Sequence, residues 1–356
     1  TFSKKINIYL YILFLVLIII FSEFSTNFAK AKNFVINDIE IKEKYDLNFN
    51  KIKVVDKAFK KAFEILISKI LQSENKSIFR STDINQIKSF VEGFSLMEEK
   101  FVDDNYQAKI NVDFNKKDLI NYFNSKGIIT SSINPIDVMI LPLLIDLKKN
   151  QIFSYSNNPF FLNWILTNKK YYQINYILPN EDIEDFSIIR KNANNIENYN
   201  FNEIFNKYNI RNRILLILLK QDNILKVFSK LNLENSEMYI NKNFKDLNLK
   251  NLDQINDIIL DLKNDYENKW KSLNKINTSI ILPIRLSLDS NNFLLSNNLE
   301  DFLKEEDLIS DYKIENFNSE QIIYKIIFNS TLDKFLTIME NAEFKIDTST
   351  DIWKLK

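Results

Sequence analysis

Paired acidic side chains are the residues of this chain whose type and spacing could do chemistry. The chain has no Cys, no His and two Gly. It therefore excludes His- or Cys-based triads, thiolate or imidazole metal sites, and glycine-rich phosphate loops. Two carboxylates about 5–10 Å apart could hydrolyse a glycosidic bond, and Glu98-Glu99 and Asp103-Asp104 are candidates. Adjacent strand residues point to opposite faces, however, and Asp103-Asp104-Asn105 is typical of a turn.

Other groups could carry chemistry, and each also has a structural interpretation. They are Ser68-Lys69 as a lysine-assisted nucleophile, Asp253, Asp257 and Asp261 as calcium ligands, Lys169-Lys170-Tyr171-Tyr172 as a single-strand contact, and Arg285 as a partner for a carboxylate. Polar helix faces, lysines after a helix end and a surface cation explain the same patterns. We therefore predict no catalytic, cofactor-binding or metal-binding residue, and no cofactor.

Five residues are instead predicted to shape the fold. Gly93 and Gly127 are expected to end helices, because glycine accepts the backbone conformation found there. Pro142 is expected at the end of a strand, where a missing N–H does little harm. Trp164 is expected in a core together with Trp270, and Trp353 in the closing strand.

The first thirty-one residues have the three-part layout of a secretory signal peptide. Lys4 and Lys5 precede an apolar stretch from Ile6 to Phe21, and Ala29-Lys30-Ala31 fits the cleavage pattern. The alternative is an uncleaved inner-membrane anchor, although the apolar stretch is shorter than the roughly 20 residues of a spanning helix. We expect a periplasmic protein. Without residues 1–31 the chain has 44 basic and 46 acidic residues, a net charge of about −2, which argues against a nucleic-acid partner.

Hydrophobic periodicity predicts three small sheet-and-helix units in series, in an α+β or α/β fold. Residues 32–130 are predicted as a β-α-α-β-β-α unit and residues 136–275 as an α/β unit, with a linker at 130–135 between them. Residues 277–356 are predicted in the order β-α-β-β-α-β, which is the ferredoxin-like plan.

Particular segments carry these predictions. Alternation predicts strands at 35–45, 106–114 and 278–288, and continuous apolar runs predict central strands at 136–145 and 213–220. Helical spacing predicts long helices at 50–71 and 252–273. The Asn-rich segment 185–200 is predicted as a loop, and a last strand is predicted at 343–347, continuing toward Trp353.

These patterns together resemble a known family. The strand and helix after the signal, Val91-x-Gly93-Phe94, the alternating Tyr106–Phe114 stretch, Val138–Leu144 and Trp353-x-Leu355 resemble domain of unknown function 2066 of proteobacterial envelope proteins. The middle unit is more weakly similar to the TolB amino-terminal domain and to the curli-export lipoprotein CsgG. The resemblance implies a fold and an envelope location, and it supplies no catalytic residues.

The functional expectation is therefore a non-catalytic periplasmic binding or scaffold protein with protein partners in the envelope. Two alternatives remain open: a carboxylate-based enzyme acting on glycan, and an accessory protein anchored in the inner membrane through residues 1–31.

Overall fold

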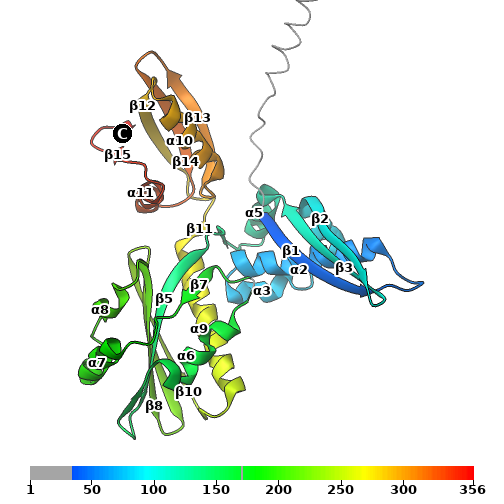
Figure 1. Ribbon diagram of the computed structural model, residues 1–356. Helices are drawn as coiled ribbons and strands as arrows, with labels where there is room; N and C mark the ends of the chain where they lie inside the picture. Colours follow the sequence, from blue (N-terminus) through cyan, green and yellow to red (C-terminus); the bar gives the residue numbers. More distant parts are fainter. Residues whose placement is uncertain (1–33, 170) are drawn as a thin grey trace, which may run out of the picture.

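The computed structural model describes residues 34–169 and 171–356. The predicted signal peptide and Lys170 lie outside the described residues. The fold is mixed α+β and contains several small sheets flanked by helices (Figure 1). None of the helices in the described part is both long and apolar enough to cross a membrane.

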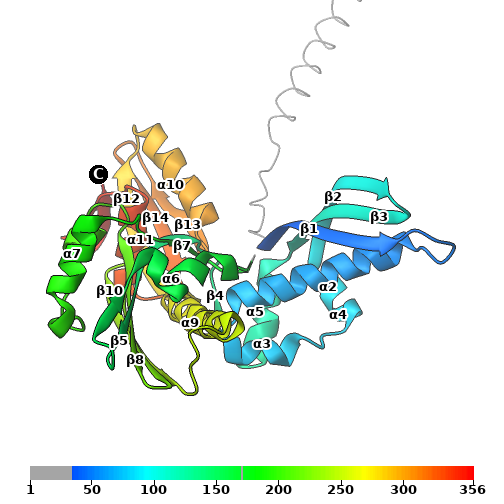
Figure 2. The same ribbon diagram turned by 60° about the horizontal axis from the view of Figure 1, so that its bottom comes forward.

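The N-terminal sheet has the strand order β1-β3-β2 and is antiparallel. Its elements are β1 (Phe34–Lys44), α2 (Lys51–Ile70), α3 (Ser73–Phe79), α4 (Ile84–Phe90), β2 (Val91–Val102), β3 (Asn105–Phe114) and α5 (Lys116–Ser125). Helix α2 begins at Asn50, whose side chain accepts the N–H groups of Ile52 and Lys53. Its apolar face packs along β1, as Figure 2 shows.

The middle sheet has the order β10-β9-β8-β5-β6, with β7 also paired to β5. Its strands are β5 (Ile136–Asp146), β6 (Gln151–Phe153), β7 (Ile174–Ile177), β8 (Asn212–Gln221), β9 (Ile224–Leu233) and β10 (Ser236–Phe244). The helical segments are η1 (Tyr155–Asn157), α6 (Pro159–Trp164), η2 (Ile165–Thr167), α7 (Ile183–Lys191), η3 (Ala193–Asn195), α8 (Asn202–Phe205) and α9 (Leu252–Leu273). The predicted central strands β5 and β8 are neighbours and parallel.

The C-terminal sheet has the order β13-β14-β12-β16-β15. It contains β12 (Leu282–Asp289), α10 (Phe293–Glu305), β13 (Ile309–Phe317), β14 (Gln321–Phe328), α11 (Leu332–Asn341), β15 (Ile346–Asp347) and β16 (Trp353–Leu355). The last predicted strand is in fact two short strands that pair antiparallel, because the chain reverses between them. Trp353 lies in β16, which pairs parallel to β12.

The segment predicted as a free linker is held in place. Strand β4 (Thr130–Ser131) pairs antiparallel with β11 (Lys275–Ile276), so the chain enters and leaves the middle unit side by side. Thr130, Ser131 and Ser132 are buried. Their backbone polar groups need partners there, and the two-stranded pairing supplies them.

Two of the predicted structural residues lie elsewhere than expected. Gly93 does not end a helix: α4 ends at Phe90, and Gly93 lies inside β2, beside a register shift between Val91 and Gly93. A glycine inside a strand commonly accompanies such an irregularity. Gly127 follows α5 with a left-handed φ of 71°.

Pro142 lies in the middle of β5 rather than at its end, opposite Leu216 of β8. On the other side of β5, β7 pairs only with Ile136–Met139 and β6 only with Leu144–Asp146. The Pro142 carbonyl faces this gap, where it accepts a hydrogen bond from Asn158 Nδ2 at 3.1 Å. A strand residue directs its N–H and C=O to the same side, so the missing N–H of Pro142 removes no ladder bond.

Candidate functional site

The middle sheet has two differently covered faces. On one face, the long helix α9 and α6 pack on alternate residues of β5 and β8, and Trp164 and Trp270 are fully buried there. On the other face lie the shorter segments α7, η3 and α8 (Figure 1). Short helices cover less of a sheet than a long helix, so the second face is left open toward the ends of β5 and β8.

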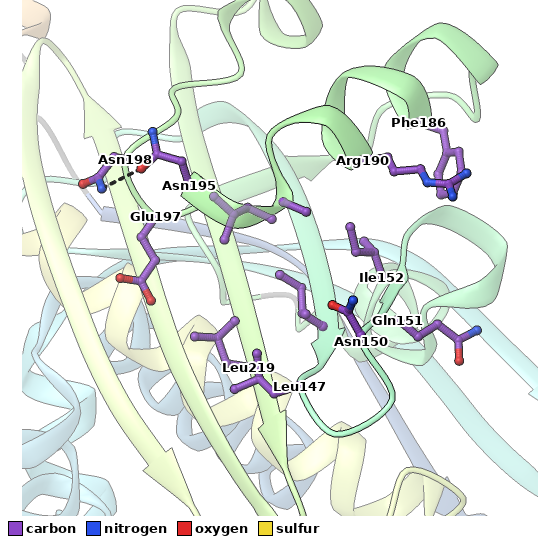
Figure 3. A pocket seen from close by; sticks show the side chains of 13 residues that line it. Leu147, Asn150, Gln151, Ile152, Phe186, Arg190, Asn195, Glu197, Asn198 and Leu219 are labelled. Atoms are coloured by element: carbon purple, nitrogen blue, oxygen red, sulfur yellow. Dashed lines mark hydrogen bonds between the residues drawn. The ribbon is translucent and has the colours of Figure 1, made fainter.

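The open end forms a recess with a cavity volume of about 840 Å³ (Figure 3). Its apolar lining includes Ile145 and Leu147 at the end of β5, Ile152 of β6, Leu219 of β8 and Phe186 of α7. Its polar lining consists of Asn150, Gln151, Arg190, Asn195, Glu197 and Asn198. A volume of this size is typical of small-ligand sites, and the lining of this recess combines apolar and polar side chains.

The recess lies at the carboxyl ends of two parallel strands, which is where open α/β sheets bind ligands. Asp146, at the end of β5, is buried. Its carboxylate accepts the backbone N–H groups of Lys148 and Lys149, each at 3.1 Å, and pairs with Lys220 of β8 at 3.2 Å. These bonds fix the turn that carries Asn150 and Gln151 to the rim.

Helix α7, which forms one wall, is anchored by its first turn. The Asp182 side chain caps the helix by accepting the N–H of Glu184 at 2.7 Å. Lys207 bridges Asp182 and the buried Asp185, each at 2.7 Å, and Tyr155 donates its hydroxyl to Asp185 at 3.2 Å. Hydrogen bonds to Asp182 and Asp185 raise the pKa of Lys207, which therefore stays charged at neutral pH.

The rim groups have few partners of their own. Asn198 donates to Asn195 at 2.9 Å, as Figure 3 shows. The Arg190 guanidinium makes no ion pair and no hydrogen bond within the described residues. Arg190 and Phe186 are one turn apart on α7, and Glu197 lies across the recess from them (Figure 3). Within the part of the chain that the structure describes, the recess thus has one cation without a protein partner, on α7, together with several carboxamides.

The covered face contains a different set of charges. Lys263, Glu267 and Lys271 are one turn apart on α9 and are all buried. Lys263 donates to Trp164 O at 2.5 Å and to Asn168 Oδ1 at 2.6 Å. Burial lowers its pKa to about 7. Burial also raises the pKa of Glu267, whose Oε1 accepts the backbone N–H groups of Gln173 and Ile174 at 2.9 and 2.8 Å.

The same face joins the middle unit to the N-terminal unit. The last carbonyls of a helix have no partner inside the helix, and here side chains from the middle of the chain supply one. Lys271 donates to Ser68 O and Leu71 O at 2.5 and 2.9 Å, Gln173 to Lys69 O at 2.7 Å, and Ser131 to Ile70 O at 3.1 Å. The end of α2 is therefore capped by another unit, so these buried polar groups hold the units together.

The predicted acid pairs do not converge on a common point. Glu98 pairs with Lys100 and Lys109 at 3.0 and 3.2 Å, and Glu99 pairs with Lys51 at 2.7 Å. Both glutamate pKa values are lowered by these lysine partners. Asp103 and Asp104 have left-handed φ angles of 49° and 58° and form the β2–β3 turn. These carboxylates serve the hairpin in the structure.

The remaining candidates are also dispersed. Ser68-Lys69 lies at the end of α2. Asp261 pairs with Lys242 at 2.5 Å, whereas Asp253 and Asp257 have no ion-pair partner among the residues that the structure describes. The Tyr171 ring lies under the Lys76 ammonium at 5.4 Å. Arg285 does bind a carboxylate: its Nε and Nη2 donate to Glu315 at 2.7 and 3.0 Å. In the described residues, no group of three or more acidic side chains could hold a metal ion.

The sequence prediction missed the wall of the recess, because residues 185–200 were expected to be a loop. Instead, α7 covers residues 183–191 and η3 follows. The available signal was Asp182 as a cap before Ile183, Phe186 and Ile189, which are spaced three apart. The surrounding Asn residues masked it.

Comparison with known proteins gives no relative from which to transfer a role. No family model and no curated protein sequence matches the chain. The resemblance to domain of unknown function 2066 therefore stays a prediction, and the function has to be argued from the recess itself.

Proposed function

We propose that this chain is a non-catalytic binding or scaffold protein of the bacterial envelope, and that it binds its ligand in the recess at the ends of β5 and β8. The observation that carries the proposal is the construction of that site. A volume of about 840 Å³ with an apolar floor lies at the carboxyl ends of parallel strands. Hydrogen bonds to Asp146 and Asp185 hold its walls in place. Within the described residues, the Arg190 guanidinium makes no ion pair or hydrogen bond, so it is available to a ligand.

The scaffold part of the proposal is supported by the joints between units. The end of α2 is capped from α9 through Lys271, and Lys116 of α5 pairs with Asp307 near β13 at 2.8 Å. Lys334 of α11 contacts Glu234 and Asn274 of the middle unit. Charged groups that bridge units in this way favour a fixed arrangement of the three units. The envelope location rests on the predicted signal at residues 1–31.

The finer fold assignments belong to this proposal as well. The order β12, α10, β13, β14, α11, β15-β16 supports a ferredoxin-like C-terminal unit. The parallel pairing of β16 with β12 is a departure from a purely antiparallel sheet. The parallel β5–β8 pair, the β8-β9-β10 meander and the closing helix α9 support a TolB-like middle unit.

Site-specific photocrosslinking in cells tests the binding role. A photoreactive residue replaces exposed Gln151 at the recess rim, and a matched control replaces exposed Tyr239 on the opposite edge strand β10. We expect a reproducible adduct from position 151 only, which disappears when Ala193→Trp fills the recess. Equal adducts from both positions, or an adduct that persists in the filled variant, would overturn the proposal, as would the absence of any adduct.

A further inference from the structure

Arg190 is the feature of the recess that identifies a ligand class. Only five of the 47 basic side chains are arginine. Two of them have protein partners. Arg285 donates two hydrogen bonds to the Glu315 carboxylate. Arg213 donates to Asn206 Oδ1 at 2.9 Å, and its guanidinium lies over the Phe205 ring. Of the other arginines, Arg190 is the one that lines the recess.

The charges of the recess restrict the ligand. Among the described residues, Arg190 and Glu197 are the only ionisable ones that line the recess, and they lie on different walls (Figure 3). A phosphate group carries a charge of about −2 at neutral pH. It would be expected to need more than one cation, and Glu197 would repel it more strongly than it repels a singly charged carboxylate. A single carboxylate matches the planar, two-pronged guanidinium and needs no second cation.

The rest of the lining restricts what carries that carboxylate. The floor of the recess includes the apolar side chains of Ile145, Ile152 and Leu219, which suit an aliphatic or aromatic side chain of the ligand. The four carboxamides of Asn150, Gln151, Asn195 and Asn198 surround this floor. Each offers both donors and acceptors, which match the alternating N–H and C=O groups of a peptide. A fatty acid chain would make no use of these donors and acceptors.

Strand β6 adds a backbone contribution. It pairs with β5 through Leu144–Asp146 on one side, and it is the last strand of the sheet at this end. Gln151 and Ile152 of this strand both line the recess. The outer edge of such a strand can pair with an extended peptide.

We propose that the recess binds the free C-terminus of a polypeptide that ends in an apolar residue, with the terminal carboxylate on Arg190. This inference rests on the proposed binding function and gives it a ligand class. It makes Arg190 a specificity determinant, because the guanidinium separates a free carboxylate from the neutral amide of a continuing chain.

The test uses N-acetylated, fluorescently labelled tetrapeptides that end in Leu, Ile, Val or Phe, each as the free acid and as the C-terminal amide. Binding to the purified protein is measured by fluorescence anisotropy. For at least one sequence, we expect the acid to bind at least tenfold more tightly than the amide. Arg190→Gln should abolish this ratio. Arg190→Lys should restore part of it, because lysine brings back the positive charge but not the planar guanidinium with its two parallel donors. Lys191→Gln, at the next position of α7, is the matched control and should keep the full ratio.

The outcomes separate this inference from the proposed function. Equal binding of acid and amide, or a ratio that survives in Arg190→Gln, overturns the carboxylate inference while leaving recess binding in place. Failure of every peptide, with a recess-dependent adduct still formed at position 151, rejects the peptide ligand alone. Failure of the peptides together with failure of the crosslinking overturns both. Thermal unfolding of each variant checks that Arg190→Gln is folded.

Discussion

The two faces of the middle sheet use charged residues in opposite ways. Beneath α9, Lys263 and Lys271 are buried, and each donates hydrogen bonds to main-chain carbonyls, while Glu267 accepts main-chain N–H groups. At the recess, Arg190 is exposed and makes no ion pair or hydrogen bond within the described residues. Both faces are built on alternate residues of the same strands β5 and β8.

Under the proposed function, this difference means that burial alone does not mark a functional charge. Buried charges are costly unless they are bonded. Lys263 and Glu267 bond within the middle unit, and Lys271 bonds to the end of α2 in the N-terminal unit. Arg190, in contrast, lies on the face of the sheet that is covered only by short helical segments. Variants on the two faces should therefore separate stability from binding.

The largest expected effect is on the covered face. Glu267→Ala removes the acceptor of the Gln173 and Ile174 N–H groups and leaves both unpaired in a buried region. An unpaired buried group costs about 1–3 kcal/mol, so we expect the free energy of unfolding to fall by about 3–5 kcal/mol. Chemical denaturation at pH 7 measures this loss.

Glu267→Gln is the control for that variant, because its side-chain oxygen can still accept both N–H groups. We expect it to lose no more than about 1–2 kcal/mol. If the alanine and glutamine variants lose the same stability, the two main-chain hydrogen bonds are not what makes Glu267 important.

An intermediate effect is expected at the anchor of the recess wall. Asp185→Ala removes the acceptor of the Tyr155 hydroxyl and one carboxylate partner of Lys207. Tyr155 is buried, and an unpaired buried hydroxyl costs about 1–3 kcal/mol. We expect a loss of about 2 kcal/mol, with faster amide exchange confined to α7. Uniformly faster exchange over the whole chain would contradict a local anchor.

The pH dependence of stability should reveal the covered lysines. The pKa of Lys263 is about 7 in the folded chain, against 10.5 for an ordinary lysine. Between these values the unfolded chain binds more protons, so the free energy of unfolding rises with pH. We expect a rise of about 1–2 kcal/mol between pH 7 and pH 9, measured by denaturant unfolding.

Lys263→Met tests the assignment of that slope. The baseline stability of the variant changes because Trp164 O and Asn168 Oδ1 lose a donor, but its rise with pH should be smaller than in the parent. An unchanged slope would show that Lys263 is not the group that titrates.

Much of the fold could be predicted because strong patterns agree with local chemistry. The helix at 252–273 and the strand at 136–145 are seen close to their expected bounds, since apolar spacing and length leave little choice. The position of Pro142 in the middle of β5 could not be predicted, because the strand accepts a proline there only where neither β6 nor β7 pairs with it. The gap between β6 and β7 arises from tertiary pairing, which local propensity does not report.

The recess was less predictable than the sheet that carries it. Arg190, Asn150 and Leu219 are far apart in the sequence and meet only because β5 and β8 end side by side. The Asn-rich composition of 185–200 also concealed α7, whose capping by Asp182 was the available clue. For Arg285, in contrast, the sequence indicated a possible carboxylate partner, and Glu315 is that partner in the structure.

The smallest effect on stability is expected at Arg190, where the binding effect should be largest. Arg190→Gln removes no ion pair or hydrogen bond within the described residues, so only the favourable position of a cation at the end of α7 is lost. We expect the free energy of unfolding to change by less than about 0.5 kcal/mol, while the preference for a free carboxylate disappears. Chemical denaturation measures the free energy of unfolding, and fluorescence anisotropy on the same protein sample measures the ratio of acid to amide binding. A stability loss as large as that of Asp185→Ala would mean that Arg190 belongs to the structural charges, and the contrast between the two faces would fail.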